Sequence, residues 1–180
     1  MHASPVPGVR RHSLRWLGLA LLVLFGLLAY LDSRMRASGG AGLLSLEFAG
    51  TGSRASAILA EWGPGAERAA VWAQVVDYGF IVAYAAFLVI AVRAAKGRAQ
   101  RFGSRPLERA ARPIAVGVVV AAASDAIQNA ALLVVLDHRS LDAAAWVARA
   151  CGIVTTTLLV ISIGYLGAVR RRGRRLGAPT

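Results

Sequence analysis

Residues 69–92 read AAVWAQVVDYGFIVAYAAFLVIAV, and this stretch decides the fold. It contains a single charged residue, Asp77. As a helix it would be about 36 Å long at the usual rise per residue. The hydrocarbon core of a bilayer is about 30 Å thick, and a helix crosses it with roughly 20 mainly apolar residues. The stretch therefore predicts a membrane-spanning helix.

One further apolar block precedes this stretch, at residues 16–31, and two follow it, at residues 113–136 and 143–169. The third block in chain order begins with Pro113, which suits the first turn of a helix because the missing N–H would have no partner there. The chain has 57% hydrophobic and 17% charged residues, more apolar than a soluble domain. We therefore expect an all-α protein, an integral membrane four-helix bundle that forms one membrane domain over residues 1–180.

The first block, residues 16–31, also resembles the apolar part of a signal peptide, because Arg10, Arg11 and Arg15 precede it. Its apolar run is long for such a segment, and Asp32 and further charged residues follow it. We expect an uncleaved anchor helix.

The distribution of basic residues predicts the orientation of the four helices. Basic residues gather between the second and third blocks and after the fourth, whereas residues 32–68 carry four arginines and four acids. Because positively charged loops stay on the cytoplasmic side, we expect both termini to face the cytoplasm. We expect this basic inner loop and the C-terminal tail to contact anionic lipid head groups. The basic residues are Arg93, Lys96, Arg98, Arg101, Arg105, Arg109 and Arg112 in the loop, and Arg170, Arg171, Arg172, Arg174 and Arg175 in the tail.

This arrangement accounts for the formal net charge of +12 without nucleic acid as a partner. No sequence motif of a nucleic-acid-binding protein accompanies the basic residues. The three histidines, His2, His12 and His138, are scattered and lack metal-ligand spacing. We therefore predict no nucleic-acid partner, no metal site and no cofactor.

The segment 32–68 is long for a connection between packed helices. An apolar run surrounds Glu47, and Thr51 or Ser53 is placed to cap a short helix from Ser53 to Glu61 that ends at Trp62. Apolar residues in an outer loop need a surface to cover. We expect this segment to contain a short helix and to form a cap over the outer face of the bundle.

Three ionisable residues, Asp77, Asp125 and Arg149, fall inside predicted spans, where each costs roughly 2.5–3.5 kcal/mol on insertion scales. Counting residues along each helix places all three at similar depth in the outer half of the membrane. We predict a buried polar cluster around them and treat it as a candidate ligand-binding site. The candidate residues are Asp77, Tyr78, Tyr84, Asp125, Gln128, Asn129, Arg149, Thr156 and Glu47.

Several interpretations of this cluster stay open at the level of sequence. The leading one is a multi-pass membrane protein that binds a small or lipid-like ligand at the polar cluster. One alternative is a membrane enzyme that uses paired carboxylates for acid–base chemistry on a lipid. Another is a structural or accessory subunit, in which an Asp–Arg pair and other polar contacts only hold helices together. Each of these interpretations is compatible with assembly of the chain with a second copy of itself or with a membrane partner subunit.

The order of several short motifs resembles that of a group of uncharacterised bacterial multi-pass membrane proteins. The motifs cover roughly residues 40–135, and the third helix carries Gln128 where a glutamate would be expected. The resemblance implies a multi-pass protein of the bacterial cytoplasmic (inner) membrane and brings no activity with it. The motif residues are Leu46-Glu47-Phe48-Ala49, Ile58-Leu59, Trp62, Asp77-Tyr78, Tyr84, Asp125 and Gln128-Asn129.

Overall fold

Helices account for nearly all of the part of the chain that the structure describes. This structure, a computed structural model, describes residues 7–38, 40–138 and 141–177, with side chains from Leu14 onward. The prediction of an all-α fold with a short helix in the outer segment is confirmed. The helices are α1 (Pro7–Arg36), α2 (Leu43–Glu47), α3 (Gly52–Glu61), α4 (Pro64–Arg101), α5 (Arg105–Asp137) and α6 (Asp142–Arg175).

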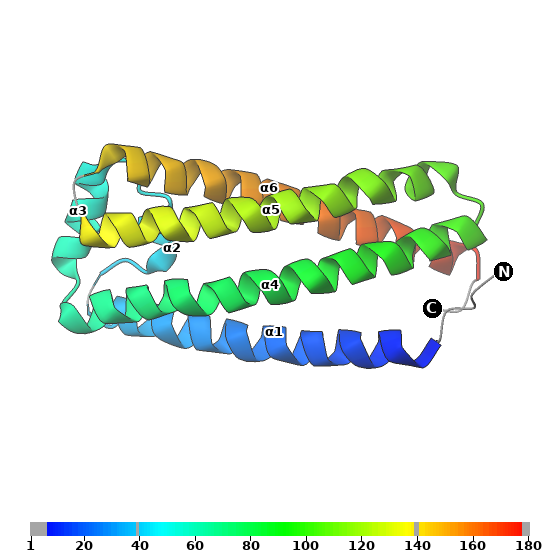
Figure 1. Cartoon of the computed structure of the whole chain (residues 1–180), viewed down its shortest axis with the longest axis horizontal. Coiled ribbons are helices and arrows are strands. Elements are labelled where there is room, and N and C mark those ends of the chain that lie inside the picture. Colours follow the sequence, from blue (N-terminus) through cyan, green and yellow to red (C-terminus); the bar gives the residue numbers. More distant parts are fainter. Residues whose placement is uncertain (1–6, 39, 139–140, 178–180) are drawn as a thin grey trace.

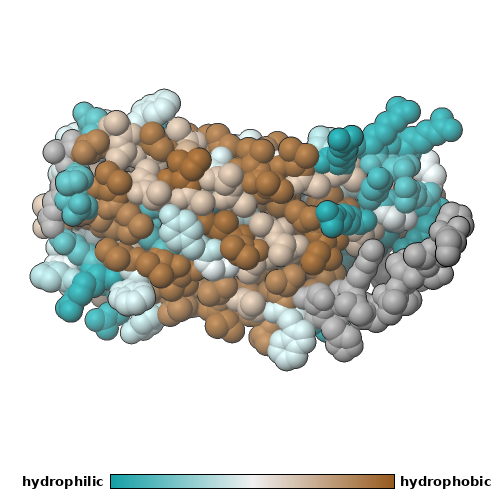
Figure 2. Space-filling model, in the orientation of Figure 1, coloured by the Kyte–Doolittle hydropathy of each residue, from teal (hydrophilic) through white to brown (hydrophobic). Residues whose placement is uncertain are grey.

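The four long helices α1, α4, α5 and α6 are each long and apolar enough to cross a membrane. They lie side by side along the long axis of the molecule (Figure 1). Apolar residues form a broad band around the middle of the surface, and hydrophilic residues gather at the two ends (Figure 2). This pattern is typical of a protein whose midsection is solvated by lipid.

The two ends of the bundle differ. The short helices α2 and α3 cover one end, which we call the capped end (Figure 1). The start of α1, the α4–α5 connection and the end of α6 lie at the opposite end (Figure 1). We call this the basic end, because arginines and Lys96 dominate it.

Packing among the long helices is uneven. Helix α5 packs extensively against α4 and α6, whereas α1 makes its main contact with α4. No residue in the most apolar stretch of α1 is buried. Gly79 of α4 faces α1, because a Cβ atom at this position would be in van der Waals contact with Cδ2 of Leu24, at 3.8 Å. Helix α1 is therefore a peripheral helix attached to one side of a three-helix core.

The helices extend beyond the apolar blocks. Helix α4 continues from Val92 to Arg101, and α5 begins at Arg105 rather than at Pro113. Pro106 occupies the first turn of α5, and Pro113 lies inside the helix. Alanine, arginine, lysine and glutamine favour helix, so these helices run on past the apolar blocks. Of the residues discussed from sequence, His2 lies outside the described part, and the side chains of Arg10, Arg11 and His12 are not described.

The predicted cap is confirmed in its main features. The Thr51 hydroxyl accepts a hydrogen bond from the backbone N–H of Arg54 at 3.3 Å, and α3 ends at Trp62. Leu46, Leu59 and Trp62 are buried in the same apolar cluster as residues of α4, α5 and α6. Burial of these side chains holds α2 and α3 against the end of the bundle.

Candidate functional site

A cavity of about 430 Å³ lies at the capped end, between α1, α2, α4 and α5. Its apolar side includes Phe25 and Leu44, whose side chains are 63% and 60% exposed on the flank of the molecule. Its polar side reaches into the bundle. The cavity thus joins an apolar flank to a polar interior. The lining residues are Phe25, Leu28, Ala29, Asp32, Arg36, Leu43, Leu44, Glu47, Gln74, Asp77 and Asn129.

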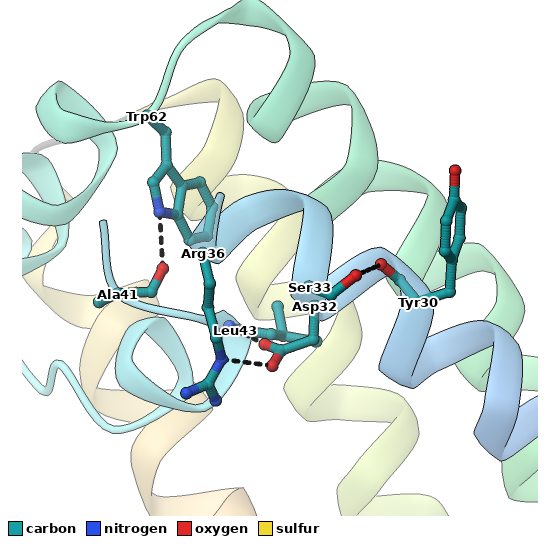
Figure 3. Close-up of polar contacts among 7 residues, drawn as sticks. All are labelled: Tyr30, Asp32, Ser33, Arg36, Ala41, Leu43 and Trp62. Carbon is teal, nitrogen blue, oxygen red and sulfur yellow. Dashed lines mark hydrogen bonds and ion pairs between the residues drawn. The ribbon is translucent and has the colours of Figure 1, made fainter. Parts of the chain in front are cut away.

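The rim of the cavity is built around Asp32, near the end of α1. Its Oδ2 atom accepts a hydrogen bond from Nε of Arg36 at 2.6 Å, and its Oδ1 atom accepts one from the backbone N–H of Leu43 at 2.7 Å (Figure 3). Nearby, the indole N–H of Trp62 donates to the carbonyl oxygen of Ala41 at 2.8 Å (Figure 3). These contacts fix the start of α2 to the end of α1.

The floor of the cavity contains Gln74 and Asp77 of α4 and Asn129 of α5. The Asn129 Nδ2 atom donates to Oδ2 of Asp77 at 2.8 Å. Gln74 is 1% exposed, and its buried Nε2 atom has no hydrogen-bond partner among the described residues. A buried amide N–H without a partner is costly, so this donor is suited to an acceptor that enters the cavity.

Glu47, the last residue of α2, brings a third carboxyl group to the cavity, beside those of Asp32 and Asp77. Burial above all, and then the negative charges of Asp77 and Asp125, raise the pKa of Glu47 from its usual 4.5 to about 7. A hydrogen bond with the Gln128 side chain acts in the opposite direction, because it stabilises the carboxylate. Glu47 is thus an acid of the cap that interacts electrostatically with the carboxyl groups of the bundle.

Asp125 of α5 lies in the same region but does not line the cavity. Its Oδ2 atom accepts a hydrogen bond from the Tyr84 hydroxyl at 2.9 Å. The hydroxyl of Tyr78 donates instead to the carbonyl oxygen of Ala126 at 3.2 Å. Both tyrosines therefore join α4 to α5, and neither lines the cavity.

Arg149 and Thr156 of α6 lie away from the cluster, on the exposed face of the helix. A Cβ atom at Gly50 would meet Nη1 of Arg149 at 2.8 Å, which places the guanidinium against the α2–α3 turn. The Asp–Arg pair that the structural-subunit alternative invokes is not formed: in the described part of the chain, Arg149 makes no ion pair. Because helical side chains lean towards the N-terminus of their helix, the side chain of Arg149 extends towards the capped end, where α6 begins.

The face of α6 that meets the bundle carries Ala148, Gly152 and Thr155, all of which are buried. The amide of Gln128 packs here, because a Cβ atom at Gly152 would lie 3.1 Å from its Oε1 atom. The Thr155 hydroxyl donates to the carbonyl oxygen of Ala121 at 3.2 Å. Two of the predicted site residues, Arg149 and Thr156, therefore lie outside the face of α6 that meets the bundle.

Three polar residues of the cavity were not among the predicted site residues: Gln74, Asp32 and Arg36. A signal for Gln74 was available, because it precedes Asp77 by three residues and therefore lies on the same face of α4. In the sequence, Asp32 and Arg36 have no feature that separates them from the other charged residues that follow the first apolar block. They line the cavity because residues 40–47 fold back against the end of α1, and a hydropathy pattern does not predict this contact.

The site offers carboxylate acceptors and one free amide donor, with Arg36 as its one cationic lining residue. Among the described residues, no group of three or more histidine, cysteine, aspartate or glutamate side chains is arranged to hold a metal ion. Comparison of the chain with protein-family models, with curated proteins and with solved structures found no match.

Proposed function

We propose that this chain is a multi-pass membrane protein that binds an amphipathic, lipid-like small molecule in the cavity at the capped end. The observation that carries the proposal is the cavity itself: its flank is apolar, and its floor includes Gln74, whose buried Nε2 atom has no hydrogen-bond partner among the described residues. The polar part of the ligand would lie on the floor. Its apolar part would extend past Phe25 and Leu44 towards the lipid.

The hydrogen-bonding groups of the floor define the polar part of this ligand. Gln74 requires an acceptor, whereas the carboxyl groups of Asp77 and Glu47 favour donors. A head group with a hydroxyl supplies both, and so does one with an amine beside an oxygen. A purely anionic head group would be repelled by the ionised carboxyl groups of the cavity.

We further propose that the chain lies in the bacterial cytoplasmic membrane with both termini in the cytoplasm. The support is the gathering of basic residues at the end of the bundle where α1 begins and α6 ends (Figure 1). The positive-inside rule assigns such an end to the cytoplasm. The cavity would then open at the outer leaflet.

The experiment that tests the binding proposal is native mass spectrometry of the full chain, released from its own membrane in a mild detergent without added ligand. We expect a stoichiometric retained species in the parent chain. Gln74→Leu removes the free donor at nearly constant volume, and Ala29→Phe fills the cavity from α1 without touching the polar floor. Both variants should lose the species. Thr156→Val, an exposed and nearly isosteric change on α6, is the matched control and should keep it.

Two results would contradict the proposal. One is a parent chain that retains no species, and the other is retention that Ala29→Phe leaves unchanged. Thermal unfolding of each variant distinguishes lost binding from lost folding. Ala29 is exposed on α1, so its substitution should leave the unfolding temperature close to that of the parent chain.

The alternative of a membrane enzyme has one specific observation in its favour. Glu47 and Asp77 both line the cavity, so an acid–base pair could act there on a bound lipid. Asp125, the other carboxyl group inside a predicted span, does not line the cavity and accepts a hydrogen bond from the Tyr84 hydroxyl. Conversion of the retained species to a product of different mass, abolished in Glu47→Gln, would favour this alternative over binding alone.

The alternative of a structural or accessory subunit predicts a dry cluster in which every polar group is paired. The cavity and the free Nε2 atom of Gln74 count against it. A stable partner subunit that co-purifies with the chain, together with loss of folding in Gln74→Leu, would support it.

A further inference from the structure

Two adjoining cavities lie between α4 and α5 at the basic end, far along both helices from the capped end. One has a volume of about 460 Å³ and the other about 400 Å³. They share two lining residues, Lys96 of α4 and Arg112 of α5. Together they form one groove, which we call the basic groove, and it is independent of the ligand site proposed above.

The basic groove is cationic towards the end of the bundle. Its cations are Arg93 and Lys96 of α4 with Arg105, Arg109 and Arg112 of α5. The acid among its lining residues, Glu108, accepts a hydrogen bond from Nε2 of Gln100 at 2.8 Å. In the described part of the chain, none of the five cations forms an ion pair with a carboxylate. Concentrated like charges of this kind favour a bound anion.

The other part of the basic groove is apolar and faces the surrounding membrane. Val92 is 1% exposed and forms its floor, whereas Val116 and Val119 are 57% and 59% exposed along its side. These valines lie one or two helical turns from Arg112 on the same face of α5. A chain of methylene groups could therefore lie along α5 while an attached anion remains among the cations.

We propose that the basic groove binds one anionic phospholipid, with its phosphate among Lys96, Arg105, Arg109 and Arg112 and an acyl chain along Val116 and Val119. Charge complementarity and the adjoining apolar surface together select this occupant. Basic pockets between membrane helices on the cytoplasmic side are known to favour such head groups. The C-terminal arginines are exposed, as are the groove cations, but they line neither cavity, so they would attract anionic lipid only diffusely.

The test is a native mass spectrometry titration of the full chain in detergent with phosphatidylglycerol, and with phosphatidylcholine of the same acyl chains. The double variant Lys96→Gln/Arg112→Gln removes the two cations shared by both cavities. Because each basic residue near an anionic lipid contributes to binding, the loss of two should weaken phosphatidylglycerol binding about thirtyfold. The matched control, Arg171→Gln/Arg174→Gln, removes the same charge from the tail and should change binding less than twofold.

A third variant tests the apolar part of the groove and guards against misfolding of the charge variant. Val119→Phe adds bulk at an exposed position and keeps every cation. It should weaken phosphatidylglycerol binding without changing the unfolding temperature. Binding that both charge variants reduce equally would overturn the proposal in favour of diffuse attraction. Equal binding of phosphatidylcholine would also overturn it.

A final arm separates a lipid from a free phosphate as the occupant. Glycerol phosphate, which has the anionic head but no acyl chain, is added as a competitor. We expect glycerol phosphate to displace bound phosphatidylglycerol only at a far higher concentration than a second phosphatidylglycerol of different acyl mass requires. Displacement at equal concentration, together with unchanged lipid binding in Val119→Phe, would show a soluble phosphate site and contradict the lipid assignment.

Discussion

Asn129 of α5 donates a hydrogen bond from Nδ2 to Oδ2 of Asp77 on α4 at 2.8 Å, and both residues line the cavity at the capped end. Asn129 is 2% exposed, so water cannot readily replace it as the donor to this carboxylate. The pair thus serves two roles at once, as a helix–helix contact and as a wall of the candidate site.

The first prediction concerns this pair. Asn129→Leu keeps the side-chain volume but leaves Asp77 without its amide donor. We expect a loss of about 1–2 kcal/mol in the free energy of unfolding, as for other buried polar contacts between membrane helices. Reversible unfolding in mixed micelles measures it. The Asp77→Leu/Asn129→Leu double variant should lose less than the sum of the two single variants, and strict additivity would contradict the coupling.

The second prediction concerns pH. The pKa of Glu47 is raised from its usual 4.5 to about 7 in the folded protein, so folding favours the protonated acid. The corresponding stability is fully present below about pH 4.5 and is lost as the pH rises to 7. The loss amounts to at most about 3 kcal/mol. Glu47→Gln cannot ionise and should flatten this slope between pH 4.5 and 7 in unfolding measurements. An unchanged slope in the variant would assign the pH dependence to other groups.

The third prediction concerns the rim. Asp32→Ala leaves the backbone N–H of Leu43 without its partner at the start of α2. We expect faster amide hydrogen exchange over residues 43–48, because this contact joins α2 to α1. Ser33→Ala is the matched control: its hydroxyl bonds only to the carbonyl oxygen of Tyr30 within the same helix, at 2.6 Å (Figure 3). Equal exchange in the two variants would mean that Asp32 does not hold α2.

The fourth prediction concerns the turn between α2 and α3. Gly50 has φ of +74°, and a Cβ atom there would lie 2.8 Å from Nη1 of Arg149. Gly50→Ala should cost about 1–2 kcal/mol for the left-handed conformation alone, and more for the displaced guanidinium. Gly103→Ala is the matched control, because Gly103 has φ of +64° with no atom within 4 Å of its Cβ position.

A further variant separates the two contributions at Gly50. Arg149→Ala removes the side chain that the new Cβ atom would meet. In this background, Gly50→Ala should cost about as much as Gly103→Ala. If the cost is undiminished, the contact with Arg149 contributes nothing to the effect.

The four long helices were predictable because hydropathy reports directly on the lipid-facing band. Their ends were not, since residues 93–101 are polar yet favour helix, and the chain turns only at Gly103. Pro113 was misleading for a related reason. It suits a first turn, but it also lies inside α5 at the cost of one backbone hydrogen bond.

The candidate site was only partly predictable. Counting residues put Asp77 and Asp125 at similar depth, and Asn129, which bonds Asp77, was among the predicted site residues. Thr51 was one of two residues expected to cap α3, and it does so. The rotation of α6 about its axis was not accessible, because Arg149 and Ala148 differ by about 100° and a single charge does not choose between them. The peripheral place of α1 was not predictable either, because its apolar block meets the same length and hydropathy criteria as those of the central helices.

The main attachment of α1 to α4 has a consequence for the synthesis of this protein. Of the four long helices, α1 is made first, and its principal packing partner, α4, follows it in the chain only after residues 37–63. Until α4 is made, α1 lacks its main packing surface. The cavity therefore does not exist in the early nascent chain: α1 and α4 assemble two of its sides, and α5 closes it last by bringing Asn129 to Asp77.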